Sequence, residues 1–211
     1  MAMSLSSTSL QASHKLMNIP KFLYHYYEST RAPFLSMSEL LASEFSKIMD
    51  EFSKNDTTEN GFDLDWKRDF YKMFRPYTES FIRGKFIEKG GQPKLKAPRY
   101  LSLGPCPWFM NWYKNPAEIK IPLDDIPSDS ISFTYPDSMM SLLIAEDRFE
   151  PFAKFKQPYH GRVYRLEELA NPIEQYGMPD QDDPINQEYG NRLVEAQVWD
   201  LNLLSHHTES V

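Results

Sequence analysis

Apolar residues in the first half of the chain recur at helical spacing. One run has intervals of four, three and four residues: Leu41, Phe45, Ile48 and Phe52. Ser36 and Glu39 form a Ser-x-x-Glu capping box in front of this run, which predicts a helix that begins after Ser36. The polar stretch 55–61 ends it. A second helix is expected over 65–89, bent or restarted at Pro76 because proline lacks the N–H that its turn needs.

The second half of the chain has short alternating runs separated by prolines and glycines, which is typical of strands. With an aromatic run near the N-terminus, the expected strands cover 22–28, 100–103, 118–123, 130–135, 161–166 and 193–199. A short helix is expected over 166–176, followed by an acidic loop. Helices then strands in this order predict an α+β fold.

The last predicted strand, 193–199, has the most informative pattern. Side chains of a strand alternate between two faces, so Glu195 and Gln197 share one face, framed by a leucine and a tryptophan. Val194, Ala196 and Val198 form the opposite face, which is typical of a core. A carboxylate beside a carboxamide on a partly apolar face is costly to bury and resembles a functional site. The alternative is an exposed face on which both side chains meet water.

Two further strands carry candidate chemistry. His25 lies among tyrosines in the run Tyr24-His25-Tyr26, where a hydrogen-bonded core histidine is the alternative to a binding role. Ser132 and Thr134 share one face of the strand 130–135, and the aromatic residues lie on the other. These hydroxyls need partners if the strand is interior.

Length and composition indicate one folded domain. The 211 residues include 41% hydrophobic residues and one cysteine, Cys106, which excludes an internal disulfide framework and a cysteine-based zinc site. We expect a polar tail at 1–17, a single α+β domain at 18–205 with a helical elaboration at about 36–90, and a frayed tail at 206–211. No apolar run is long enough to span a bilayer, so we expect a cytoplasmic protein without membrane contact.

The net charge of -7 conceals a basic segment over 67–99. Between Trp66 and Arg99 there are ten basic and three acidic residues. Such a segment with interleaved aromatics could bind RNA or DNA. The aromatics at 66, 70, 74, 77 and 81 keep helical spacing, however, which favours a buried stripe with the basic residues on the solvated face.

The order of these features resembles the ADP-ribosyltransferase fold. The resemblance rests on Leu23-Tyr24-His25-Tyr26 in the first strand, on Ser132 to Tyr135 in a middle strand, and on Val194-Glu195-Ala196-Gln197-Val198 in a late strand. The Tyr-His-Tyr opening is similar to members with His on the first strand, which include nucleic-acid-modifying toxins and RNA 2′-phosphotransferases. The resemblance implies a mixed, split β-sheet with an inserted helical segment.

The resemblance also implies a role for each matching residue. NAD would be the cosubstrate and no metal would be required. His25 would bind the adenosine-side ribose of NAD, Tyr26 or Tyr135 would stack on the nicotinamide, and Ser132 or Thr134 would brace the glutamate.

Glu195 would be the catalytic carboxylate, and Gln197 would orient the acceptor. Arg31 could meet the pyrophosphate of NAD, because a guanidinium suits phosphate oxygens. Glu-x-Gln departs from the Glu-x-Glu of arginine-modifying members, which leaves a nucleic-acid base or another side chain as the acceptor. The implied function is an intracellular toxin or defence effector, with an antitoxin or immunity protein as a partner. The alternatives are an RNA 2′-phosphotransferase-like enzyme and a noncatalytic protein-binding module.

Overall fold

A computed structural model describes residues 19–54, 65–148, 150–184, 186 and 191–208. The predicted polar tail at 1–17 and the predicted helix break at 55–61 lie outside the described residues, as do residues 209–211 of the predicted C-terminal tail.

Six strands form one sheet. They are β1 (Phe22–Glu28), β2 (Arg99–Leu103), β3 (Pro116–Pro122), β4 (Ile131–Thr134), β5 (Val163–Tyr164) and β6 (Glu195–Val198). Their order across the sheet is β3-β1-β2-β6-β4-β5, and every pair is antiparallel. The predicted α+β class is confirmed, whereas the sheet is antiparallel rather than mixed. The last strand, β6, lies between β2 and β4, which brings the C-terminal pattern to the middle of the sheet.

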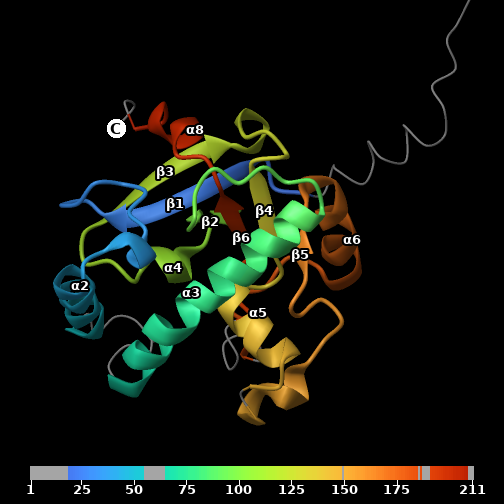
Figure 1. Cartoon of the computed structure of the whole chain (residues 1–211), viewed down its shortest axis with the longest axis horizontal. Helices are drawn as coiled ribbons and strands as arrows, with labels where there is room; N and C mark the ends of the chain where they lie inside the picture. The colour runs from blue at the N-terminus through green and yellow to red at the C-terminus, as the bar shows by residue number, and fades with distance from the viewer. Residues whose placement is uncertain (1–18, 55–64, 149, 185, 187–190, 209–211) are drawn as a thin grey trace, which may run out of the picture.

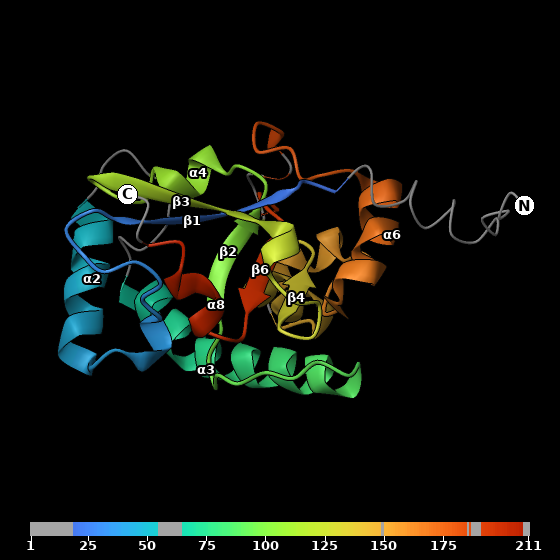
Figure 2. The ribbon, with the colours of Figure 1, turned by 90° about the horizontal axis from the view of Figure 1, so that it is seen from above.

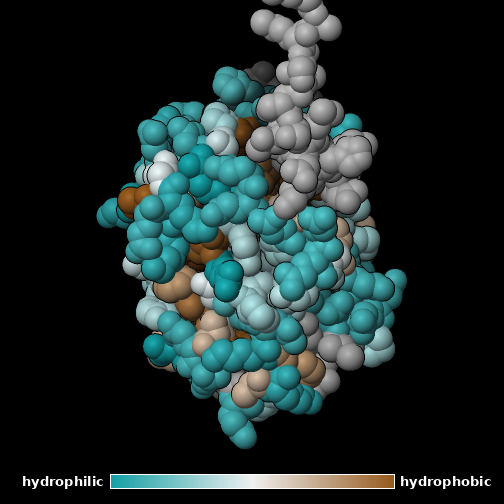
Figure 3. All heavy atoms as spheres, turned by 90° about the vertical axis from the view of Figure 1, so that its right-hand side faces the viewer, coloured by the Kyte–Doolittle hydropathy of each residue, from teal (hydrophilic) through white to brown (hydrophobic). Residues whose placement is uncertain are grey.

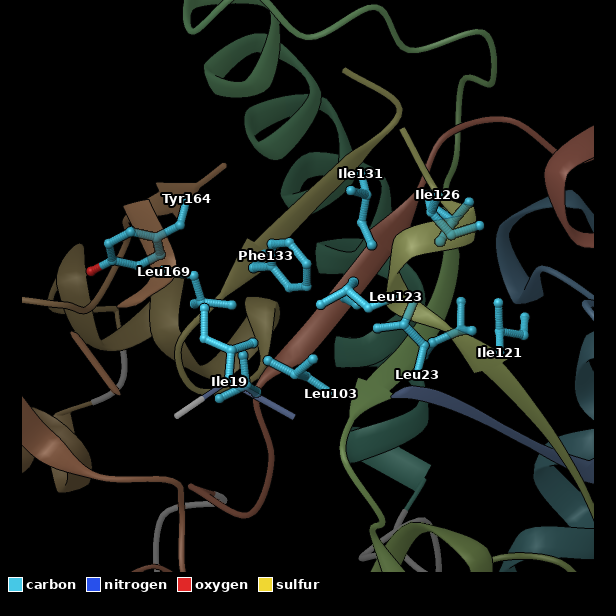
Figure 4. Close-up of a cluster of buried hydrophobic side chains, with 14 of the residues drawn as sticks. Ile19, Leu23, Leu103, Ile121, Leu123, Ile126, Ile131, Phe133, Tyr164 and Leu169 are labelled. Atoms are coloured by element: carbon cyan, nitrogen blue, oxygen red, sulfur yellow. The ribbon is translucent and has the colours of Figure 1, made fainter. Parts of the chain in front are cut away.

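One face of the sheet carries the main hydrophobic core. Figure 4 shows Leu23, Leu103, Ile121, Ile131 and Phe133 pointing into it. Helix α6 (Leu166–Tyr176), whose predicted range is confirmed, and the short α8 (Asn202–Ser205) contribute side chains to the same cluster. The three apolar residues of the predicted last strand that were expected to face a core do so, since Val194, just before β6, and Ala196 and Val198 within it are all fully buried there.

The first helix begins later than the capping box predicts. Residues Met37–Glu39 form a short 3₁₀ turn, and α2 covers Ala42–Lys54. The Ser36 side chain makes no capping bond, and the Glu44 carboxylate instead accepts from the Leu41 backbone N–H. Leu41 is therefore left outside the helix and 69% exposed, whereas the other three apolar residues of the run are buried.

Helix α3 (Asp65–Glu88) crosses the sheet on the face opposite the main core and contacts α5 and β5 (Figures 1 and 2). It continues through Pro76 without the restart that was one of the two expectations there. Pro76 and Lys72, whose carbonyl loses its helical partner there, are both exposed, so water can satisfy that carbonyl. The helix ends before Gly90, whose φ of 87° favours glycine, as the sequence predicts.

The aromatic stripe predicted as the buried face of α3 is wrong. Tyr77 is 41% exposed, and Phe70, Phe74 and Phe81 are only partly buried. The fully buried residues lie one position further round the helix: Thr78, Glu79, Ile82 and Phe86. Because this face covers polar side chains of the sheet, it carries a carboxylate and a hydroxyl that a search for apolar periodicity ignores. The side chain of Trp66 lies outside the description.

The remaining elements are short. They are α4 (Pro107–Met110), α5 (Ser138–Ala145) and the 3₁₀ turns Leu123–Asp125 and Glu150–Phe155. Helix α5 was not predicted, because its apolar residues form a continuous run without helical spacing. The face of the molecule that carries α6 is mostly hydrophilic, with small separate apolar patches (Figure 3). Among the described helices none has the length and apolar character needed to cross a membrane.

Candidate functional site

A polar network lies on the sheet face that α3 covers. Glu195 pairs in register with Ser102 on one side and Thr134 on the other, and Gln197 pairs with Tyr100 and Ser132. The alternative of a solvent-exposed face is wrong, since Gln197 is fully buried and Glu195 is 9% exposed. The structure therefore brings together four of the predicted residues, those of β4 and β6.

Gln197 uses both ends of its carboxamide. Its Oε1 accepts from the Ser132 hydroxyl at 2.9 Å, and its Nε2 donates to Thr134 Oγ1 at 2.9 Å and to Glu195 Oε2 at 3.2 Å. Trp199 Nε1 donates to Ser132 Oγ at 2.9 Å and completes the chain. Thr134 and Ser132 thus support Glu195 through Gln197, and the predicted bracing of the glutamate is indirect.

Glu195 and Asp137 meet the same helix N-terminus. Glu195 Oε2 accepts from the Ser138 backbone N–H at 2.9 Å, and Asp137, the N-cap of α5, accepts from the Met140 N–H at 3.0 Å. Burial and the neighbouring charge of Glu195 raise the pKa of Asp137 to about 7. A helix N-terminus stabilises negative charge, so this position offsets part of the cost of burying two neighbouring carboxyl groups, of which Asp137 can hold a proton.

Helix α3 places a cation beside these acids. The Arg75 guanidinium lies 3.6 Å from the centre of the Tyr100 ring and donates to Glu79 Oε1 at 3.2 Å. Burial opposes the charge of Arg75, but Tyr100, Tyr71 and the carboxylates of Glu195 and Glu79 raise its pKa above the ordinary value. Arg75 therefore stays charged and offsets the buried carboxylates.

The sheet splits beside this network. Strand β1 pairs with β3 along its whole length, but its pairing with β2 covers only Leu23 and Tyr24. The His25 ring spans the start of the split. Its Nε2 accepts from the Phe34 N–H at 2.8 Å, so the neutral ring carries its proton on Nδ1, which faces the Tyr100 carbonyl at 3.4 Å. Burial lowers the pKa of His25 to about 4.

A cavity of about 120 Å³ lies in the split between β1, α2, α3 and α4. His25, Tyr26 and Arg31, three predicted cofactor-binding residues, all line it. Tyr71, Arg75 and Tyr100 form its wall toward the sheet, and the charge of Glu195 acts on all three. Glu195 itself does not line the cavity.

The predicted cofactor-binding residues differ in whether their polar groups are already bonded within the protein and in whether they reach the cavity. The Tyr26 hydroxyl accepts from the Cys106 N–H at 2.8 Å, and burial raises the pKa of Tyr26 to about 12. Arg31 forms an ion pair with Glu51 and keeps a quarter of its side chain exposed. Tyr135 is not brought to this site: it packs in the core on the other face of the sheet, where its hydroxyl donates to the Gly177 carbonyl.

Cys106 and the basic segment over 67–99 are poor candidates for a functional site. Burial raises the pKa of the Cys106 thiol to about 11, so it is not a thiolate nucleophile at neutral pH. Six cations of the basic segment form ion pairs with acidic residues of the chain: Arg68, Arg75, Lys85, Lys89, Lys94 and Arg99. In the described part of the chain, no three His, Cys, Asp or Glu side chains gather as a metal site would require.

Sequence reasoning missed Arg75, Asp137 and Glu28, each of which lies in the network or the cavity wall. Asp137 could have been recognised in the sequence. Aspartate is a common helix N-cap, whose carboxylate accepts from the backbone N–H three residues later, here that of Met140. Arg75 was hidden among other basic residues and carried none.

Comparisons with family models, curated proteins and solved structures give no match.

Proposed function

We propose that this protein is an NAD-dependent ADP-ribosyltransferase in which Glu195 is the catalytic carboxylate. The observation that carries the proposal is the cavity in the split of the sheet, which His25, Tyr26 and Arg31 line and whose wall adjoins buried Glu195. A split sheet with a His strand on one side and a Glu strand on the other agrees with the resemblance to the ADP-ribosyltransferase fold.

The proposed reaction breaks the bond between the nicotinamide nitrogen and the ribose carbon. The bonding electron pair leaves with nicotinamide, so positive charge develops on the ribose in the transition state. A preplaced carboxylate stabilises charge that exists mainly in that state, and the acceptor then forms the new bond to the same carbon. Gln197 fixes the Glu195 carboxylate through its bond to Oε2 and cannot act freely on the acceptor.

One rival from the sequence, an RNA 2′-phosphotransferase-like enzyme, receives less support. An RNA 2′-phosphotransferase would need free cations for an RNA phosphate near His25, but both arginines that line the cavity pair with glutamates. In the described part of the basic segment, six cations are likewise paired with carboxylates of the chain. The acceptor class is left to experiment.

The test measures nicotinamide release and transfer of labelled ADP-ribose from NAD to mixed RNA, DNA and protein. We expect transfer by the wild type and loss of at least about a hundredfold in rate with Glu195→Gln, which removes the charge but keeps the shape. Glu150→Gln, at an exposed glutamate, is the matched control. Equal rates for Glu195→Gln and wild type would reject the proposal.

A further inference from the structure

A second cavity, of about 410 Å³, lies at the sheet edge that is formed by β5, on the far side of β6 and β4 from the split. Strand β5, helix α6 and the C-terminal end of α3 border it (Figure 1). Its volume is within the range of about 300–1,000 Å³ that is typical of small-molecule sites. Arg75 lines the first cavity and Lys85 lines this one, so about 15 Å of helix separates the two. The second cavity is therefore a separate site.

The wall of this second cavity has an excess of positive charge. Three cations and one carboxylate line it: Lys85, Lys89, Arg162 and Glu168. Lys89 Nζ donates to both carboxylate oxygens of Glu168, at 2.8 and 2.7 Å, so these two charges balance each other. Lys85 pairs with Glu88, which does not line the cavity, and Arg162 is exposed and has no ion pair within the described part of the chain. The cavity therefore favours an anion.

Tyr164 presents a hydroxyl to the same cavity. The residue is 8% exposed and belongs to the main core, but its hydroxyl points away from the other core side chains (Figure 4). The charges of Arg162 and Glu168, which both line the cavity, act on this hydroxyl. It has no hydrogen-bond partner among the described residues, and burial raises the pKa of Tyr164 to about 12, so it keeps its proton at neutral pH. The hydroxyl is therefore available to donate to an anionic ligand.

The groups around the cavity indicate the class of the anion. A guanidinium suits the oxygens of a phosphate, and a lysine and a tyrosine hydroxyl add further donors. An inorganic phosphate is only a few times larger than a water molecule, which takes about 30 Å³, so it would fill only part of the cavity. The rest of the wall includes the half-buried ring of Tyr176 and the exposed Pro158, against which a flat ring can pack. A phosphate joined to a sugar and a base meets these requirements.

We propose that this second cavity binds a nucleoside monophosphate unit, with the phosphate at Arg162, Lys85 and the Tyr164 hydroxyl and the base against Tyr176. The site uses neither Glu195 nor the cavity in the split, so the inference does not depend on the proposed function. The same unit occurs as a free nucleotide and within a single-stranded nucleic acid. The experiment distinguishes these two sources.

The experiment is titration calorimetry of the full chain with the common 5′-mononucleotides, their nucleosides, inorganic phosphate and a short single-stranded oligonucleotide. We expect a mononucleotide to bind at least about tenfold more tightly than its nucleoside, which lacks the charge, and more tightly than inorganic phosphate, which lacks the ring. An oligonucleotide that binds more tightly than every mononucleotide would assign the site to a strand, and the reverse order would assign it to a free nucleotide. Inorganic phosphate that binds as tightly as the mononucleotides would overturn the inference.

Two variants locate the binding in this cavity. Arg162→Gln should weaken it roughly tenfold, and Tyr164→Phe, which removes only the hydroxyl, should weaken it about fivefold without lowering the unfolding temperature. Lys47→Gln, at an exposed lysine of α2, is the control for lost charge and should change nothing, as should Glu195→Gln.

Wild-type affinity in both Arg162→Gln and Tyr164→Phe would overturn the inference. It would also be overturned if the folded wild type bound no mononucleotide and no oligonucleotide at millimolar concentration. Either result would leave the proposed reaction of NAD standing, because that reaction is tested through Glu195.

Discussion

The carboxamide of Gln197 is the centre of the buried network, and its removal has a calculable cost. We consider Gln197→Leu, which keeps much of the volume and removes every hydrogen bond. Thr134 Oγ1 and Glu195 Oε2 each lose the Nε2 donor, and the Ser132 hydroxyl loses its acceptor. Gln197 is fully buried, so water cannot replace these bonds without a rearrangement.

The magnitude follows from the groups left behind. A neutral group left unsatisfied in the interior costs about 1 kcal/mol or more, and a charged group costs about 2 kcal/mol or more. Two neutral hydroxyls and one carboxylate oxygen are affected, although the Ser132 oxygen still accepts from Trp199 and Glu195 Oε2 still accepts from the Ser138 N–H. We therefore expect the free energy of unfolding to fall by about 2–3 kcal/mol, a large share of the roughly 5–15 kcal/mol that holds a typical domain.

The assay is urea unfolding followed by tryptophan fluorescence. With a slope of about 3 kcal/mol per molar urea, the expected loss lowers the midpoint by roughly 1 M. Gln92→Leu, at an exposed glutamine, is the control and should shift the free energy by less than about 0.5 kcal/mol. A shift for Gln197→Leu no larger than that of the control would refute the network as described.

Three further predictions concern pH and packing. As pH falls from about 6.5 to about 4, His25 is protonated in the unfolded chain but not in the folded chain, so the free energy of unfolding decreases. His25→Gln should reduce this decrease, which urea unfolding at several pH values across the range would measure. Asp137 changes the stability in the opposite direction, because its pKa of about 7 in the folded chain exceeds its usual value. Stability is lost as pH rises from about 4 to 7, and Asp137→Asn should weaken that dependence, whereas an unchanged slope would contradict the assigned burial. Gly91→Ala places a Cβ about 2.5 Å from the buried Phe86 ring and should lower the unfolding temperature, whereas Gly84→Ala, in open space on α3, should raise it.

Local alternation predicted the sheet well. The faces of β6 and β4 follow from a period of two, because both strands are interior and each side chain has a fixed direction. The range of α6 follows from its apolar spacing. The register that joins Ser132 and Thr134 to Gln197 depends on contacts between distant parts of the chain, and no local pattern contains it.

The burial of charge explains what sequence reasoning missed. Arg75, like the other basic residues, was expected on the solvated face of α3, yet it covers the polar side of the sheet together with Glu79, and each charge offsets the other. A hydrophobic periodicity assigns charged residues to solvent and so placed the buried stripe on the wrong side of the helix. Glu28 likewise gave no signal, because its two backbone donors come from a segment about 86 residues away.

The most direct test of the central claim is nicotinamide release from NAD by wild type and by Glu195→Gln under identical conditions. The account predicts release by the wild type and a rate at least about a hundredfold lower for a variant that unfolds at the same temperature. Release at the wild-type rate by folded Glu195→Gln would show that the buried carboxylate has no catalytic role. If folded wild-type protein neither releases nicotinamide nor binds NAD, the proposal that this protein is an NAD-dependent enzyme is contradicted.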